Sequence, residues 1–414
     1  MDPKIEMIPH WPVVARDRET VIDVLLKISP PSGDECDEQI PLNLGLVIDR
    51  SGSMRGLKLD YAKKAARYLV ENLNDTDRVS ITIFDDNVDT IATGTLAREK
   101  KRLVNLINRI QARGTTALHD GWVQGGVEVG TFLDASKINR VILLSDGLAN
   151  RGLTNPDLIA RDVRGLSNRG ISTSTLGLGE DYDERLLAAM AESGDGNFFH
   201  IDSPAKLPEI FSIELEGLVN TFGLGVSLAV RLHNGVILED MFNDFERDRQ
   251  GAFVLPNMIS DNTLRVVIRL RVPPILETKD IFSIDLGWNE PKLERRTVAS
   301  KTLRMESVAS DELDHLTADE EVIEEVALLQ VARAKEEAIS WIDQGEYETA
   351  ENSLDTALGV LEGAPPSESI NYEIDSLENL KRQIIRGEEA MFSKTALYES
   401  YNMKKSRDTL TYKR

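Results

Sequence analysis

The sequence predicts an α/β fold: a domain with a mostly parallel sheet and helices on both faces, inserted in a small antiparallel β-sandwich and followed by a C-terminal helical region. Between residues 40 and 220, short apolar segments alternate with amphipathic helical patterns, which is typical of parallel sheets covered on both faces. Over residues 221–308, apolar and polar side chains alternate without intervening helices, as in half-buried antiparallel strands. From Asp311 onward, apolar residues recur at helical spacing.

The first region, residues 1–39, is expected to contribute strand structure to the sandwich. Residues 19–30 are rich in β-branched and aliphatic side chains, and the Pro-Pro-Ser-Gly-Asp sequence that ends at Asp34 marks the end of this strand. Because the α/β sheet offers this strand no partner, we assign it to the sandwich. The α/β domain of residues 40–220 is then an insertion between two sandwich strands, with its own termini close together.

The first helix of the α/β domain is predicted over residues 56–73, because apolar side chains recur there every four residues and form one face. A strand follows at 79–84, and a polar turn leads into a second strand at 88–92. Further helices are expected at residues 96–110, 118–133, 156–168, 183–193 and 205–219. Strands are expected between them at residues 141–144, 172–176 and 198–201.

Four strands of the sandwich are predicted after Thr221, and the alternation is clearest from Arg265 to Val272. They are placed at residues 225–232, 251–255, 263–272 and 280–286.

Two apolar stripes at helical spacing predict an antiparallel helix pair within residues 311–393, similar to a single tetratricopeptide-type hairpin. Gly345 ends the first helix, and the Gly-Ala-Pro-Pro sequence from residue 363 ends the second. A third helix is predicted near residues 370–391, where it would pack on the pair. The remaining residues, 394–414, mix tyrosines with basic side chains and form either a docking tail or a disordered end.

Composition restricts the partners and the compartment. Acidic residues outnumber basic residues by 70 to 48, for a net charge of -22. Such a surface repels phosphate backbones and anionic lipid, so we expect no nucleic-acid or membrane partner. Cys36 is the single cysteine, so no intrachain disulfide can form. With no signal-peptide pattern and no segment apolar enough to cross a bilayer, we expect a cytoplasmic protein. The oligomeric state is not predicted.

The most informative segment is LGLVIDRSGSM, residues 44–54. An apolar strand ends at Asp49, Ser51 and Ser53 follow at alternate positions, and a helical pattern then begins. These three side chains can converge beyond the carboxyl end of the strand, where open α/β sheets bind their ligands. A carboxylate with hydroxyls suits a hard cation such as Mg²⁺, Mn²⁺ or Ca²⁺.

This segment resembles the D-x-S-x-S signature of von Willebrand factor A (VWA) domains, which belongs to their metal-ion-dependent adhesion site. The sequence GTTALHDG, residues 114–121, resembles the threonine loop of that family, and Thr116 is the better aligned of its two threonines. The sequence VILLSDG, residues 141–147, resembles the aspartate turn and nominates Asp146. Two later segments, residues 175–179 and 196–201, resemble the last strands of the domain.

The resemblance covers roughly residues 40–220 and implies a Rossmann-like VWA domain, similar to those of intracellular prokaryotic VWA proteins. It implies five metal ligands, which are Asp49, Ser51, Ser53, Thr116 and Asp146. In the family, an Asp or Glu of a partner protein supplies a missing ligand of the cation.

A purely structural role accounts for only part of this pattern. Ser53 could cap the helix that follows it, but a cap does not explain the remaining four oxygen-bearing residues. Two further acidic groups fit solvated turns better than cation sites; they are Asp85, Asp86 and Asp89, and Asp181, Asp183 and Asp195. The five histidines show no spacing typical of zinc ligands.

The site predicts a non-enzymatic binding or scaffold protein whose cation captures a carboxylate of a partner protein. Mg²⁺ is the expected cation, with Mn²⁺ or Ca²⁺ as alternatives. A metal-dependent hydrolase acting on phosphoesters is the rival hypothesis, but the three loops offer only His119 and Asp120 as a general base. A third hypothesis makes the protein a VWA accessory subunit of an AAA+ ATPase. The chain has no P-loop and no Gly-x-Ser-x-Gly motif.

Overall fold

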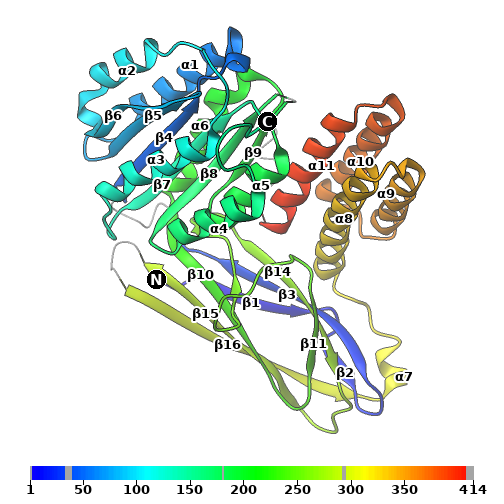
Figure 1. The fold of residues 1–414 in the computed structure, drawn as a ribbon. Coiled ribbons are helices and arrows are strands. Elements are labelled where there is room, and N and C mark those ends of the chain that lie inside the picture. The colour runs from blue at the N-terminus through cyan, green and yellow to red at the C-terminus, as the bar shows by residue number, and fades with distance from the viewer. Residues whose placement is uncertain (1, 33–39, 180, 291–294, 407–414) are drawn as a thin grey trace. The chain divides into compact units, whose positions relative to one another are not determined.

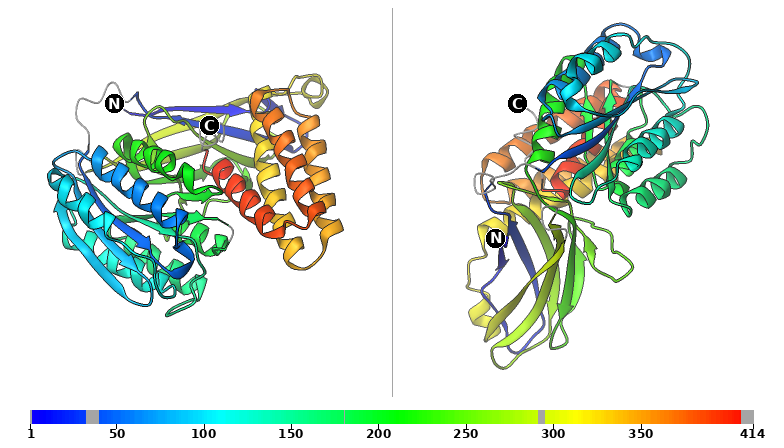
Figure 2. Two further views of the ribbon diagram at one scale, coloured as in Figure 1. Left: turned by 90° about the horizontal axis from the view of Figure 1, so that it is seen from above. Right: turned by 90° about the vertical axis from the view of Figure 1, so that its left-hand side faces the viewer.

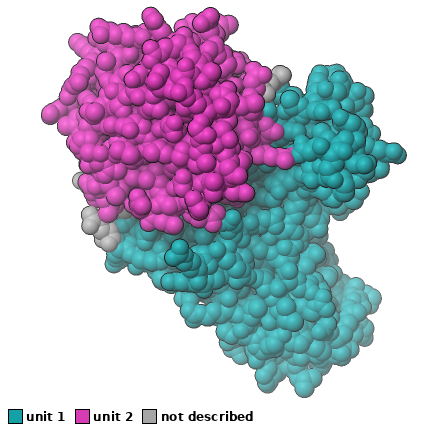
Figure 3. All heavy atoms as spheres, in the orientation of Figure 1, with its two compact units in different colours: residues 1–35, 222–290, 295–414 teal, residues 36–221, 291–294 magenta. Residues whose placement is uncertain are grey.

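The computed structural model of the chain (Figure 1) describes residues 2–32, 40–179, 181–290 and 295–406. The single cysteine, Cys36, lies outside these described residues. The chain divides into two compact units (Figure 3). Of the described residues, the α/β unit comprises 40–179 and 181–221, and the sandwich-helical unit comprises 2–32, 222–290 and 295–406.

The α/β unit is built on a six-stranded sheet in the order β6-β5-β4-β7-β8-β9. Its strands are β4 (Leu42–Asp49), β5 (Arg78–Phe84), β6 (Val88–Leu96), β7 (Ile138–Ser145), β8 (Ile171–Leu178) and β9 (Phe198–Ile201). Neighbouring strands are parallel except for the antiparallel pair of β5 and β6. Every residue of the central strands β4 and β7 is buried, because helices cover both faces of this sheet.

Helices lie on both faces of the sheet (Figures 1 and 2). They are α1 (Leu57–Asn72), α2 (Lys100–Asn108), α3 (Leu118–Thr131), α4 (Pro156–Ser167), α5 (Glu184–Ser193) and α6 (Leu207–Val219). Helix α3 packs on β4, β5, β6 and β7, whereas α1 packs on α2 and α6. The mostly parallel α/β class predicted from the sequence is confirmed.

Helix α3 approaches β4 closely because glycines face each other across the contact. A Cβ on Gly125 of α3 would lie 2.2 Å from Cγ2 of Val47, and a Cβ on Gly45 of β4 would lie 2.7 Å from Cγ2 of Val129. Side chains larger than hydrogen at either position would therefore push the helix off the sheet.

The sandwich of the second unit contains two antiparallel sheets. The first has the order β1-β3-β14-β11, formed by β1 (Lys4–Pro9), β3 (Thr20–Ser29), β14 (Leu264–Val272) and β11 (Ile237–Met241). The second has the order β12-β10-β15-β16-β2 and is formed by β12 (Phe253–Val254), β10 (Thr221–Leu232), β15 (Lys279–Glu290), β16 (Arg295–Val308) and β2 (Val13–Ala15). Its neighbouring strands are antiparallel except for β2, which pairs in parallel with β16. In addition, β13 (Met258–Ile259) pairs with β10.

Strands β3 and β14 join the chain before the α/β unit to the chain after it. Their register runs from Ile28 opposite Leu264 to Thr20 opposite Val272. The predicted insertion of the α/β domain between sandwich strands is therefore confirmed. The sandwich core is apolar and includes the fully buried Trp288.

The helical region follows the short helix α7 (Ser310–Leu313) and contains four longer helices. They are α8 (Glu320–Asp343), α9 (Tyr347–Glu362), α10 (Glu368–Arg386) and α11 (Glu389–Lys404). Helix α8 packs on α9 and on α11. Within the described parts of the chain, no helix has the length and apolarity that a membrane span requires.

The expected third helix near residues 370–391 is present as α10, but it ends at Arg386, because Gly387 adopts a left-handed conformation with φ of 72°. The expectation for the following residues was wrong. Residues 394–404 were expected in a docking tail or disordered end, yet they belong to α11, where Tyr398 and Tyr401 are buried. Residues 407–414 lie outside the described residues.

A buried charged network ties α8 to α10 and α11. The side chain of Lys335 is fully buried, and its ammonium donates hydrogen bonds to the carboxylates of Glu373 and Glu399. The Nζ–Oε2 distance to Glu399 is 2.8 Å. Burial alone would lower the pKa of Lys335, but the attraction of the two carboxylates outweighs it and raises that pKa.

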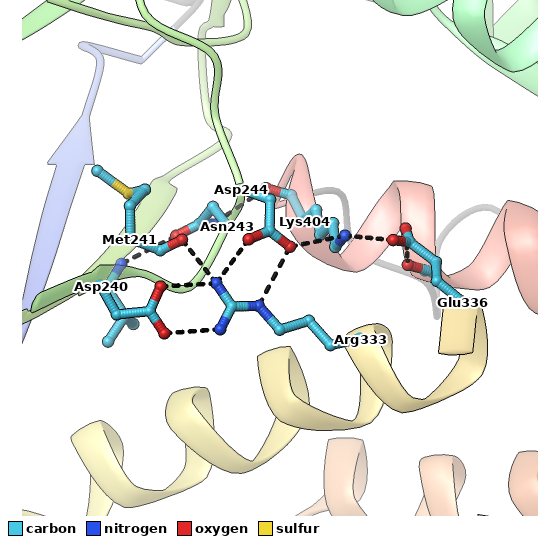
Figure 4. Close-up of polar contacts among 9 residues, drawn as sticks. Asp240, Met241, Asn243, Asp244, Arg333, Glu336 and Lys404 are labelled. Carbon is cyan, nitrogen blue, oxygen red and sulfur yellow. Dashed lines mark hydrogen bonds and ion pairs between the residues drawn. The ribbon is translucent and has the colours of Figure 1, made fainter. Parts of the chain in front are cut away.

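A second charged cluster joins the helical region to the sandwich (Figure 4). Arg333 of α8 donates two hydrogen bonds to the carboxylate of Asp240, at 2.7 and 2.9 Å, and one to the carbonyl oxygen of Met241 at 2.8 Å. It also pairs with Asp244, and Lys404 of α11 reaches the same carboxylate at 2.8 Å. Helices α8 and α11 are thus tied to the end of β11 and the residues after it, and both contact Asp244.

Candidate metal centre

The five predicted site residues lie where three chain segments meet at one edge of the α/β sheet. Asp49 ends β4, and Asp146 directly follows the neighbouring parallel strand β7. Ser51 and Ser53 precede α1, in and beside the short 3-10 helix η2 (Gly52–Met54), and Thr116 precedes α3. Because the carboxyl ends of neighbouring parallel strands share an edge, the topology brings these residues together.

Asp49 is fully buried, and both of its carboxylate oxygens accept hydrogen bonds. The Ser51 backbone N–H donates to Oδ1 at 2.7 Å, and the Ser145 hydroxyl donates to Oδ2 at 2.6 Å. Burial raises the pKa of Asp49 to about 6, while the hydrogen bonds from Ser145 and Ser51 act in the opposite direction. Both of these hydrogen-bond donors are uncharged, so a nearby cation would favour the ionised form of Asp49.

The two serines connect the ends of β4 and β7. The hydroxyl oxygens of Ser51 and Ser53 lie 3.0 Å apart, and the Ser53 hydroxyl donates to Oδ1 of Asp146 at 2.8 Å. Asp146 is itself fully buried. A continuous chain of polar contacts therefore runs through Asp49, Ser51, Ser53 and Asp146.

Thr116 faces the same small space from the second loop. A Cβ placed on Gly147 would lie 3.2 Å from Oγ1 of Thr116 and 3.6 Å from Oγ of Ser53, so both hydroxyls flank this glycine. The backbone N–H of Thr116 donates to the side-chain oxygen of Asn150 at 3.2 Å, which ties the threonine loop to the chain after β7. The structure thus places all five predicted residues around one point.

The threonine loop is held against the serine loop by the backbone. The Gly52 N–H donates to the Gly114 carbonyl at 3.1 Å, and the Arg113 N–H donates to the Arg50 carbonyl at 2.8 Å. Both arginine side chains also pair with the buried carboxylate of Asp85, at 2.8 Å from Arg50 and 2.7 Å from Arg113. This carboxylate was expected in a solvated turn and instead links the two loops.

No additional cation site is found in the part of the chain that the structure describes. No group of three or more His, Cys, Asp or Glu side chains there is arranged to hold a metal ion. His119 lies 3.3 Å from the Asp162 carboxylate, and the buried indole of Trp122 donates to Thr173 at 3.1 Å. Both side chains therefore have structural partners.

The sequence did not point to Lys58, the second residue of α1. Its ammonium lies 2.6 Å from Oδ2 of Asp146, although lysines in a first helical turn ordinarily extend into solvent. Ser145 was also missed. A hydroxyl at the end of a fully buried strand, next to the nominated Asp146, was the available signal for it.

The chemistry of this donor set fits a hard divalent cation. It consists of three hydroxyls and two carboxylates, with no thiolate or imidazole, and such oxygen ligands suit Mg²⁺, Mn²⁺ or Ca²⁺ better than soft metals. The burial of Asp49 points the same way, since an ionised carboxylate at that position needs a positive charge nearby.

Comparison with known proteins identifies the domain that carries this site. Residues 43–213 match the family model of the von Willebrand factor type A domain. The uncharacterized protein sll0103 of Synechocystis is 25% identical over 338 residues, which cover 78% of this chain and 79% of that protein.

Two other relatives match a smaller part of the chain. The E. coli protein YfbK is 26% identical over 219 residues, or 52% of this chain and 38% of that protein. The human inter-alpha-trypsin inhibitor heavy chain H3 is 27% identical over 165 residues, or 38% of this chain and 18% of that protein. The chain thus spans much less than the full length of these two relatives.

Solved structures share the fold along nearly the whole chain. A von Willebrand factor type A protein from Catenulispora acidiphila aligns with a TM-score of 0.73 at 18% identity, covering 96% of both chains. The ArnB paralog VWA2 from Sulfolobus acidocaldarius aligns with a TM-score of 0.66 at 19% identity, covering 98% of both chains. The chain therefore contains a von Willebrand factor type A domain, and it is similar to bacterial proteins that carry this domain.

Proposed function

We propose that the VWA domain of this protein holds a divalent cation, Mg²⁺ in the first place, and through it binds a carboxylate of a partner protein. The ligands proposed for the cation are Asp49, Ser51, Ser53, Thr116 and Asp146. This role makes the protein a binding or scaffold protein without catalytic activity. An AAA+ ATPase is one class of partner that the same chemistry fits.

One observation carries the proposal: a buried carboxylate that accepts hydrogen bonds from uncharged donors lies next to paired hydroxyls. Asp49 is fully buried, its oxygens accept from Ser51 and Ser145, and the hydroxyls of Ser51 and Ser53 lie 3.0 Å apart beside it. Because these hydrogen bonds occupy its oxygens, Asp49 would act mainly as a fixed negative charge. The three hydroxyls of the site would then be the direct ligands.

The number of charges explains why a partner's carboxylate would be attracted. Two aspartates at most balance a divalent cation, and neutral hydroxyls donate less electron density than carboxylates do. A cation held in this way keeps an affinity for one further anionic ligand. An Asp or Glu side chain presented by another protein has that chemistry.

Hydrolysis of phosphoesters fits the described residues less well. His119, in the first turn of α3 after the threonine loop, has its Nε2 3.3 Å from the Asp162 carboxylate. The Nζ of Lys58 is already paired with the buried Asp146 carboxylate at 2.6 Å. The other candidate from the sequence, Asp120, has its Oδ1 3.8 Å from Nδ1 of the same His119. Both candidate bases therefore already have a side-chain partner, which favours the binding role over hydrolysis.

The proposal is tested by titrating the full chain with Mg²⁺ and with Mn²⁺ in a calorimeter. We expect one binding site, which Asp49→Asn abolishes and Asp60→Asn leaves unchanged, since Asp60 is an exposed acid on α1. Equal binding by both variants, or no binding by the wild-type chain, would contradict the proposed site. Partner capture from the native cell should then depend on the metal, and should be lost with chelator and in Asp49→Asn.

A further inference from the structure

Lys58 introduces a positive charge into the candidate metal centre. Its Nζ lies 2.6 Å from Oδ2 of Asp146 and 3.7 Å from Oδ2 of Asp181. The Asp146 side chain is fully buried, whereas 26% of the Lys58 side chain and 77% of the Asp181 side chain are exposed. Of these two acids, the buried carboxylate therefore has the closer and better shielded contact with the ammonium.

The end of the Lys58 side chain is packed rather than free in solvent. It lies against Gly179, which follows β8 and has a φ of 81°. A Cβ on Gly179 would lie 3.6 Å from both Cε and Nζ of Lys58. The lysine thus extends from α1 to the chain that follows β8, where it also meets Asp146.

Asp146 presents different oxygens to Lys58 and to the serine loop. Oδ2 accepts from Lys58, and Oδ1 accepts from the hydroxyl of Ser53. A cation bound on the hydroxyl side therefore does not require Lys58 to leave. The ammonium and the cation can share one carboxylate.

We infer that Lys58 is a built-in positive charge of the metal centre, which weakens binding of the cation alone and strengthens binding of an anionic partner group. This inference rests on the function proposed above. Asp49 and Asp146 together contribute two negative charges, and Lys58 removes one of them. The site then has a net charge of about -1 when empty and about +1 with a divalent cation, a balance that attracts a carboxylate.

The sign of the effect separates this role from a structural one. If Lys58 acts by its charge, Lys58→Met should increase the affinity of the full chain for Mg²⁺ and Mn²⁺ by about tenfold, because a repelling charge near the cation is removed and the negative charge of Asp146 is no longer partly neutralised. Lys58→Arg keeps the charge and should keep the affinity near that of the wild-type chain. If Lys58 only holds Asp146 in place, Lys58→Met should weaken metal binding.

The experiment measures metal affinity by calorimetry for the wild-type chain, for both Lys58 variants and for Lys64→Met. Lys64 is an exposed lysine on the same helix and serves as the control, with no change expected. Asp181→Asn provides an independent variant. Removing the second acid near Lys58 should concentrate the ammonium on Asp146 and weaken metal binding about twofold.

The outcomes distinguish this inference from the proposed function. Tighter binding by Lys58→Met alone, with Lys58→Arg and Lys64→Met unchanged, supports the inference. Unchanged or weaker binding by Lys58→Met overturns it while leaving the metal site intact. Absence of binding by the wild-type chain overturns the proposed function itself. If Lys58→Met does not fold, Asp181→Asn decides the question. The inference is then overturned when Asp181→Asn binds metal as tightly as the wild-type chain does, or more tightly.

Discussion

Lys335→Met is expected to destabilise the helical region strongly, because it removes the positive charge that lies between two buried carboxylates. The ammonium of Lys335 is fully buried between Glu373 and Glu399, whose side chains are 2% and 3% exposed. Methionine has a similar length and fills the space of the lysine stem. The substitution therefore leaves two buried carboxylates without their common partner and changes little else.

The size of the effect follows from this burial. Removing one partner of a buried ion pair costs about 3–5 kcal/mol, because the remaining charge stays out of water without compensation. The raised pKa of Lys335 means that its contribution to stability is complete below its ordinary pKa, and is lost only as the pH rises through the raised value. The wild-type network therefore contributes fully at neutral pH.

Hydrogen exchange of peptides from α8 and α11, read by mass spectrometry on the full chain, measures the local free energy of opening. The control is Lys381→Met on α10, which removes a partly exposed ion pair with Asp355 and should cost about 1 kcal/mol or less. A loss no larger than that of the control at neutral pH would refute this reasoning.

Two further predictions concern stability in other parts of the chain. Burial raises the pKa of Glu325 to about 7, although the positive charge of Arg265 acts in the opposite direction. The folded chain therefore binds a proton at Glu325 more tightly than the unfolded chain does. The free energy of unfolding should accordingly fall as the pH rises from about 4.5 to 7. In Glu325→Gln, the loss of thermal stability between pH 5 and pH 8 should be smaller than in the wild-type chain; an equal loss would contradict the assignment. Gly125→Val should destabilise the α/β unit by about 2 kcal/mol or more, because the new side chain would clash with Val47. The control is Gly165→Ala on α4, where the new methyl group meets no other atom. This control should be neutral or stabilising by up to about 1 kcal/mol. Circular dichroism melts of both glycine variants measure this difference, and equal melting temperatures would show that α3 can move off the sheet without cost.

The sequence predicts the α/β unit well because its signals are local and strong. Strands such as β4 and β7 are buried along their whole length and are therefore mostly apolar. The polar residues at their carboxyl ends, Asp49 and Asp146, stand out against that background. The order of three motifs at strand ends then places the site without any knowledge of the packing.

Elements with a mostly exposed surface are harder to predict. Strand β16 was not recognised, because only Met305 of its fourteen residues is buried and its sequence therefore shows no apolar alternation. The break between α10 and α11 depends on the left-handed conformation of Gly387. A glycine within a polar helical pattern does not by itself show that the chain will reverse there.

The contribution of Lys58 to the site could not be predicted from sequence spacing. Its contact with Asp146 joins residues that are 88 positions apart, and it depends on how α1 lies over the ends of β7 and β8. The motif alone contains two negative groups, whereas the folded chain adds a positive one. Sequence patterns thus predict which residues gather at a site more readily than the charges that surround them.

The central claim is that hydroxyls from two loops surround one divalent cation, and a crystal structure of the full chain grown with Mn²⁺ tests it most directly. We expect an anomalous peak within about 2.2 Å of the hydroxyl oxygens of Ser51, Ser53 and Thr116, with Lys58 still on the far oxygen of Asp146. An empty site at saturating Mn²⁺, with the serine hydroxyls still bonded to each other and to Asp146, would contradict the claim.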